Sequence, residues 1–333
     1  MRRVTCREDG ITAVFVLFMM VPLMGMAGYV IDVGIVRQER RELQNGADAA
    51  ALAAAQTCAL NVAQCTAGGL SGVLSGGLSA DGFADANAKD GAAAITGITP
   101  NTVTQKVKVD TRTETSGGAT SLTMQFAQLF GHATSTVTAT ATAAWGAPSG
   151  ATTVPLTVSY CQWKALTGDD VTYPTASLTI FFKDDNVTTC AGPAGQNMPG
   201  GFGWLDTNAG PCAAQVTAGG LLGSDPGNGN PNNNGCQPSN FLNKDVLFPV
   251  FKAFTGQGQN ATYTIHGLAT FHITGMRLAN SGGWTTNPAP CAANKRCVVG
   301  YFLKDIIPWA GGNVLPCSSS APCLGTQFVK LVA

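Results

Sequence analysis

The uncharged stretch formed by residues 11–31, ITAVFVLFMMVPLMGMAGYVI, constrains this chain more than any other feature. As an α-helix rising about 1.5 Å per residue it would span about 31 Å, which matches the roughly 30 Å hydrocarbon core of a bilayer. Charged residues flank it, with Arg7 before and Asp32 after. We therefore expect a membrane-spanning helix, marked by Ile11, Phe15, Pro22, Gly25, Gly28 and Ile31. A membrane helix tolerates the internal proline when neighbouring groups satisfy the freed carbonyl.

A cleaved signal peptide is the alternative interpretation of this stretch. Gly25, Met26 and Ala27 could form a small-residue cleavage site after an apolar region of the usual length. The apolar run continues past that point to Ile31, which favours an uncleaved membrane helix.

The cysteines indicate the compartment. Cys6 precedes the apolar stretch, and the other ten of the eleven cysteines follow it. An even number on one side predicts five disulfides outside the cell and one reduced thiol in the cytoplasm. Ten free thiols in a reducing compartment are the alternative. Ten cysteines allow about 945 connectivities. Pairing of nearest neighbours is one of them, and with a local Cys58–Cys65 bridge it gives Cys161–Cys190, Cys212–Cys236, Cys291–Cys297 and Cys317–Cys323.

The charge balance bears on nucleic acid as a partner. Lys plus Arg and Asp plus Glu number 19 each, so the net charge is zero. No stretch has a sustained basic surface, which argues against nucleic acid as a partner. The 333 residues leave room for a membrane anchor and one or two domains.

Residues 33–57 continue the helix into water with a face of small side chains. The residues Val36, Leu43, Ala47, Ala50 and Ala54 recur at helical spacing. Small side chains let another backbone approach closely. Two interpretations follow: the face packs against helices of partner subunits, or the chain's own globular domain covers it.

The same region resembles a known family. The pattern begins with Gly10, Ala13 and Val14, followed by the proline-bearing apolar helix, then Asp32-Val33-Gly34, and then the run LQNGADAAALAAA at residues 43–55. It is similar to the N-terminal segment of TadG-like Tad/Flp pilus-assembly proteins. Gly46 stands where the corresponding run of those proteins has alanine. Residues 141–145 and 200–206 also resemble segments of Tad-like proteins. Pilins are often cut after a glycine such as Gly10, but their usual glutamate at the fifth mature position is replaced here by Phe15.

The remaining sequence predicts an α+β protein with a pilin-like order of elements and then a mostly β, disulfide-stapled domain. We expect a short helix at residues 80–94, a strand at 101–110, a helix with an apolar stripe at Leu122, Phe126, Leu129 and Phe130, and a strand at 134–145. Later strands are expected at 156–161, 177–183, 246–251, 261–274, 297–304 and 327–332, and a loop at 228–235. The predicted units are residues 1–57 (cytoplasmic tail, membrane helix and its extension), 58–147 (small α+β region) and 148–333 (mostly β extracellular domain).

Catalytic and metal-binding patterns are missing from the sequence. No nucleophile elbow, phosphate-binding loop or dinucleotide-binding motif occurs. His132, His266 and His272 have no further ligands at metal-site spacing. The acid pairs at 169–170 and 184–185 are typical of solvated turns, with a calcium site as the alternative. We expect no catalytic residue, no metal and no cofactor.

These features predict a single-pass membrane protein that serves as a structural or assembly subunit of a Tad/Flp-type pilus or a related surface apparatus, and not an enzyme. Its expected partners are the membrane and other pilus-assembly or pilin-like subunits, with a homo-oligomer left open. The alternative is a cell-surface adhesin or wall-binding module whose helix is a simple anchor. An extracellular hydrolase is disfavoured by the missing motifs.

Overall fold

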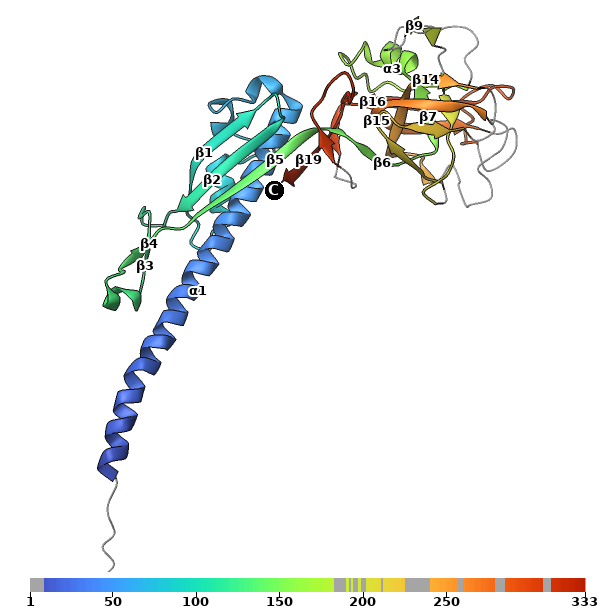
Figure 1. The fold of residues 1–333 in the computed structure, drawn as a ribbon. Coiled ribbons are helices and arrows are strands. Elements are labelled where there is room, and N and C mark those ends of the chain that lie inside the picture. Colours follow the sequence, from blue (N-terminus) through green and yellow to red (C-terminus); the bar gives the residue numbers. More distant parts are fainter. Residues whose placement is uncertain are drawn as a thin grey trace, which may run out of the picture.

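The computed structural model describes residues 9–182, 190–191, 193, 197–198, 202–210, 212–224, 240–256, 260–278, 285–307 and 313–332; for 9–13, 197–198 and 202 it describes the backbone alone. Within these residues a long N-terminal helix carries a first β-sheet along its C-terminal half, and a second sheet lies beyond the end of the helix (Figure 1). This order confirms the predicted α+β class.

Helix α1 (Asp9–Leu60) is one unbroken α-helix of 52 residues. It joins the predicted membrane stretch to its polar extension, and Pro22 lies inside it without ending it. Alanine, leucine and methionine, which favour helices, supply much of its length.

The first sheet packs on α1 through its central strands. In β2 (Lys106–Thr113) buried and less buried residues alternate, so Val107 and Val109 face the helix while Lys106 and Lys108 face water. The order across the sheet is β1-β2-β5-β19-β17, and β18 pairs with β5. The bounds are β1 (Ala93–Asn101), β5 (Thr138–Pro148), β17 (Asp305–Ile307), β18 (Val314–Leu315) and β19 (Thr326–Val332), with the short helices η1 (Val62–Gln64), η2 (Gly69–Ser71) and α2 (Ala80–Asp85) beside α1.

The C-terminal strands return to this first sheet. Strand β19 pairs antiparallel with β5, with Phe328 opposite Gly146 and Val332 opposite Thr142. Strand β17 pairs parallel with β19. Strand β18 pairs with β5, and β17 joins the first sheet through β19. The sequence pattern does not show these pairings, because strand partners distant in sequence leave no local signal.

The second sheet has the order β11-β7-β14-β15-β16-β8, with β13 on β15. Its two longest strands, β14 (Lys244–Thr255) and β15 (Thr262–Arg277), form an antiparallel pair. Phe271 and Phe248 lie in the core on one face, together with Trp163 of α3 (Tyr160–Thr167). The other elements are β6 (Gly150–Thr153), β7 (Leu156–Ser159), β8 (Leu178–Phe181), β9 (Cys190–Ala191), β10 (Asn197–Met198), β11 (Phe202–Trp204), β12 (Ala214–Thr217), β13 (Leu221–Gly223) and β16 (Cys297–Leu303).

Each of the six strand runs predicted after residue 153 overlaps an observed strand. The predicted loop at 228–235 lies outside the described residues. The expected strand at 101–110 begins later, at Lys106, because residues 102–105 form the turn between β1 and β2.

The helix expected at 80–94 is shorter, because α2 ends at Asp85 and strand β1 begins at Ala93. The second predicted helix, with the apolar stripe, is wrong. Residues 122–135 form a small hairpin made of β3 (Leu122–Thr123), the 3₁₀-helix η3 (Ala127–Phe130) and β4 (Thr134–Ser135). Gly131 ends η3 in the left-handed conformation, with φ of 86°, which glycine adopts at little cost. The four apolar residues lie at different places in this hairpin, which is located beside the middle of α1 (Figure 1).

Candidate functional site

Helix α1 is divided into two zones with different surroundings. In the first zone, residues 14–31, which we call the membrane zone, the large apolar side chains are each 51% to 79% exposed. The core helix of a soluble protein would bury such side chains, whereas only 6% of the most apolar window of this helix is buried. By length and composition this zone can cross a membrane as a single-pass anchor. Phe15, Pro22 and Ile31 lie in it, and the side chain of Ile11 lies outside the described residues.

The second zone is buried against the chain's own first sheet. Ala47, Ala50 and Ala54 are fully buried and contact β2 and β5, while Leu43 and Val36 pack in a neighbouring cluster. Methyl side chains let the strands lie close to the helix axis. The small-residue face is thus occupied within the chain, as the second of the two interpretations held, and this face is closed to a partner helix.

Gly46 contributes to the same packing. A Cβ at this position would lie 3.0 Å from the Cα of Ala84 in α2, closer than ordinary side-chain contacts. The glycine that interrupts the alanine run therefore lets the short helix α2 lie directly on α1. Its cost in helix propensity, about 1 kcal/mol relative to alanine, is offset by this contact.

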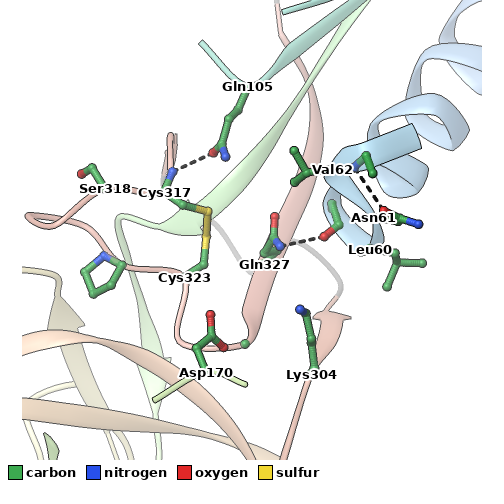
Figure 2. A pocket seen from close by; sticks show the side chains of 14 residues that line it. Leu60, Asn61, Val62, Gln105, Asp170, Lys304, Cys317, Ser318, Cys323 and Gln327 are labelled. Carbon is green, nitrogen blue, oxygen red and sulfur yellow. Dashed lines mark hydrogen bonds between the residues drawn. A yellow bond between two sulfur atoms is a disulfide. The ribbon is translucent and has the colours of Figure 1, made fainter. Parts of the chain in front are cut away.

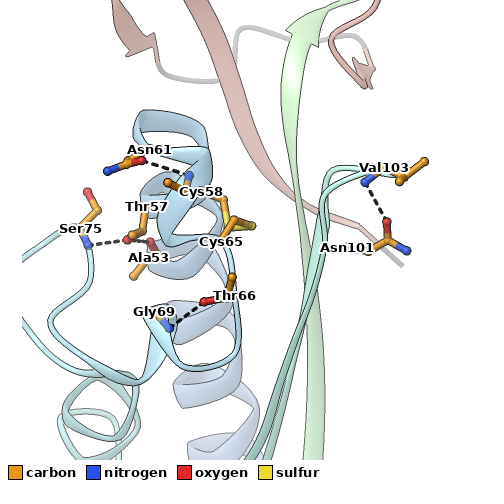
Figure 3. The surroundings of a disulfide bond; sticks show 11 residues. Ala53, Thr57, Cys58, Asn61, Cys65, Thr66, Gly69, Ser75, Asn101 and Val103 are labelled. Carbon is orange, nitrogen blue, oxygen red and sulfur yellow. Dashed lines mark hydrogen bonds between the residues drawn. A yellow bond between two sulfur atoms is a disulfide. The ribbon is translucent and has the colours of Figure 1, made fainter.

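The C-terminal end of α1 is secured by covalent and polar contacts (Figure 3). Cys58 and Cys65 form a disulfide with a Cα–Cα distance of 4.8 Å. The Thr57 hydroxyl donates to the carbonyl of Ala53 at 2.9 Å and accepts the backbone N–H of Ser75 at 2.8 Å. These bonds hold the loop after the helix against its last turns.

Three further predicted disulfides are confirmed: Cys161–Cys190, Cys291–Cys297 and Cys317–Cys323. The predicted pairing of Cys212 with Cys236 involves a residue outside the described range. Of the confirmed bridges, Cys161–Cys190 closes the longest loop, with a sequence separation of 29.

Asp32 joins the membrane zone to the hairpin of residues 122–135. Its carboxylate accepts the backbone N–H groups of Gln125 at 2.9 Å, Phe126 at 2.9 Å and Ala127 at 2.6 Å. Burial, which leaves the residue 3% exposed, disfavours the charge. The three N–H donors outweigh that effect, so the pKa of Asp32 lies below its usual value.

Gly28 lies one turn closer to the N-terminus and contacts the ring of Phe126. A Cβ at position 28 would fall 2.4 Å from that ring, so no larger residue fits while Phe126 stays in place. In the sequence pattern Gly28 was only a mark of the membrane helix, and Asp32 was noted only as part of the family resemblance, without a structural role. The signals for Asp32 are that resemblance and its position, as an acid at the C-terminal end of an uncharged run.

A cleft of about 620 Å³ lies where the end of α1, strand β19 and the second sheet meet (Figure 2). Two of the glutamine side chains that line it bind backbone groups. The Gln327 amide donates to the last-turn carbonyl of Ala59 at 2.9 Å, and the Gln105 side chain accepts the backbone N–H of Cys317 at 2.6 Å. These contacts join the end of α1 and the turn before β2 to the C-terminal segment.

The three histidines have separate environments. His266 is buried beside the ring of Tyr160, and burial and the nearby charge of Lys252 lower its pKa from 6.5 to about 4. The Nδ1 atom of His272 lies 2.6 Å from Asp245. His132 is exposed at the end of the hairpin's 3₁₀ turn. Within the described ranges, no three His, Cys, Asp or Glu side chains gather as a metal site would require.

The other motifs noted in the sequence have structural positions. Trp204 of the residue 200–206 segment is buried in the core of the second sheet. Asp169 and Asp170 occupy a turn with positive φ, and the Lys164 ammonium 2.7 Å away lowers the pKa of Asp169. The acids at 184–185 lie outside the described residues.

Comparison with known proteins agrees with the N-terminal pattern. No curated protein and no solved structure matches the chain. One family of proteins does match, over a segment that includes the exposed apolar zone, Gly28, Asp32 and the alanine-rich face. Residues 10–57 match the TadE/G-like family of Flp pilus-assembly proteins, as the sequence resemblance predicted.

Proposed function

We propose that this chain is a membrane-anchored structural or assembly subunit of a Tad/Flp-type pilus or a related surface apparatus. The observation that carries the proposal is the division of α1 within the family-matched segment. The chain covers the alanine-rich half of the helix with its own sheet, and it leaves residues 14–31 uncovered.

The uncovered zone is the part of the helix that can pack with other membrane helices. It contains Gly25, where an added Cβ would meet no atom within 4 Å, and a mixture of Phe, Leu, Met and Val side chains. Helices associate in membranes through close packing, which small residues permit. Partner subunits would therefore meet this chain inside the bilayer, beside the N-terminal half of α1.

The folded body, meaning the two sheets with the C-terminal half of α1, would be presented outside the cell. Four formed disulfides among the described residues after the membrane zone fit an oxidising compartment. With the body outside, residues 1–10 would lie in the cytoplasm and the zone 14–31 would cross the membrane once.

Photocrosslinking from two positions on α1 tests the assembly role. A photoreactive amino acid at position 18, where Phe18 is 79% exposed, should capture other pilus-assembly subunits in native membranes. The same group at position 60 is the control. Leu60 is 52% exposed on the same helix but lies beyond the membrane zone, so it should not capture these subunits.

Capture of no other protein from any position between 14 and 31 would contradict the assembly role. Binding of the full chain to cells or cell wall, combined with that result, would instead favour a surface adhesin or wall-binding module with a simple anchor.

A further inference from the structure

The hairpin of residues 122–135 ends in two exposed apolar side chains that the proposed assembly role does not use. Leu129 is 78% exposed and Phe130 is 74% exposed. They lie on η3, whose first N–H group donates to the Asp32 carboxylate. Neither side chain is covered by any part of the chain that the structure describes, so two large apolar groups stand together at the tip of a fixed turn.

The hairpin is fixed at a defined height along α1. Asp32 holds the backbone of residues 125–127, and the ring of Phe126 rests on Gly28. Gly28 lies three residues before the end of the uncharged run at Ile31, which is about 5 Å along the helix axis. Phe126 therefore lies at the depth of the C-terminal end of the membrane-spanning zone.

The charge pattern of the hairpin fits the boundary of a bilayer. Residues 115–163 contain no Asp, Glu, Lys or Arg, and His132 is the one titratable side chain of the hairpin. Aromatic and leucine side chains bind the region between headgroups and acyl chains through apolar area. Because the hairpin has no basic residue, anionic lipid would add little attraction.

We propose that Leu129 and Phe130 insert into the phospholipid leaflet on the side of the folded body, as a second membrane contact beside α1. The occupant of this surface is lipid, because η3 is bonded to Asp32, directly after the exposed apolar zone of α1, and that zone is the part of the helix that meets lipid. Two contacts, one through the helix and one through the hairpin, fix the rotation of the body about the helix axis. The inference rests on the proposed membrane anchoring of α1.

Fluorescence quenching in vesicles tests the insertion. The full chain would be reconstituted into phosphatidylcholine vesicles with a small environment-sensitive fluorescent amino acid at position 130. Two matched positions serve as references: position 18 in the membrane zone and position 103, where Val103 is 84% exposed on the turn between β1 and β2. Quenchers are lipids spin-labelled near the headgroup and iodide in the water.

We expect the label at 130 to resemble the label at 18. Its quenching by spin-labelled lipid should exceed that at 103 at least about threefold, and iodide should quench only the label at 103. Replacing part of the phosphatidylcholine by phosphatidylglycerol, or raising the salt concentration, should leave the result unchanged.

Quenching by iodide at 130 as strong as at 103 would overturn the insertion. Protection of the label from both quenchers would overturn it too, because a protein surface would then cover the hairpin. A label at 18 that lipid does not quench would instead show that α1 does not span the bilayer, and both proposals would fail together.

Discussion

Gly28 of α1 and Phe126 of the hairpin are in direct contact, with the ring occupying the place that a side chain at position 28 would need. The same hairpin gives three amide protons to Asp32 one turn further along the helix. This contact joins a glycine of the apolar zone to an aromatic ring far along the chain, and it sets the position of the hairpin relative to the membrane zone.

Replacing Gly28 by leucine should release the hairpin, since the new side chain would displace the Phe126 ring. Hydrogen exchange at the amides of Gln125, Phe126 and Ala127 should become at least about tenfold faster, because these donors would lose their fixed acceptor. The control is Gly25→Leu, at a position with no atom within 4 Å of an added Cβ. Equal exchange in the two variants would contradict a role for the Gly28 contact.

Replacing Gly46 by alanine should destabilise the packing of α2 on α1, although alanine has the better helix propensity. The added methyl group meets the backbone of Ala84, and such overpacking costs about 1 to 3 kcal/mol. Gly34→Ala is the matched control, because nothing lies within 4 Å of an added Cβ there and the change should gain up to about 1 kcal/mol. Urea midpoints of both variants measure the difference, and a stabilised Gly46→Ala protein would refute the packing argument.

Acid should weaken the second sheet through His266. The folded pKa of about 4 lies below the ordinary 6.5, so between these values the unfolded chain binds more protons than the folded one. The free energy of unfolding should therefore fall by about 2 to 3 kcal/mol as the pH drops from 6.5 to 4, and this component should then level off. Denaturant titrations across this range should show a smaller decline for His266→Gln; an unchanged decline would assign the acid sensitivity to other groups.

Disulfide removal should have a graded effect that follows the length of the closed loop. Loop-closure entropy predicts a loss of about 2.5 kcal/mol without Cys58–Cys65 and about 3.6 kcal/mol without Cys161–Cys190. The difference follows from the sequence separations of 7 and 29. Urea unfolding under oxidising conditions, with both cysteines of each bridge replaced by alanine, tests this order of stability losses. A larger loss of unfolding free energy for the shorter loop would contradict it.

The orientation of the chain can be read from Cys6, the one cysteine before the membrane zone. If residues 1–10 are cytoplasmic, a membrane-impermeant maleimide should label the chain only after the cells are permeabilised. Cys6→Ser should then abolish the labelling, because the other cysteines are expected to be in disulfides. Labelling of Cys6 in intact cells would place the N-terminus outside.

Much of the local structure could be predicted from residue patterns. The uncharged run and the alanine run together predict one long helix, and α1 is found where the sequence indicates it. Alternation of valine with polar residues located β2, and the spacing of neighbouring cysteines gave Cys58–Cys65, Cys291–Cys297 and Cys317–Cys323. Each of these signals lies within a short length of chain.

The hairpin shows where local pattern was insufficient. Leu122, Phe126, Leu129 and Phe130 have helical spacing, and yet the segment folds as a hairpin with a 3₁₀ turn. Asp32, distant in sequence, accepts the amides of residues 125–127, and the N–H of Met124 donates across the hairpin to Ala133. Tertiary hydrogen bonds replaced the bonds that an α-helix would have made.

The sequence by itself located the long apolar helix and the similarity to pilus-assembly proteins, and it predicted an oxidising compartment from the cysteines. Composition, period and short spacing carry this information. Only the tertiary structure decided what covers the alanine face, where β19 pairs, and how Gly28 and Asp32 hold the hairpin. The physical reason is that these contacts join residues far apart in the chain, and their energies depend on packing that no local pattern encodes.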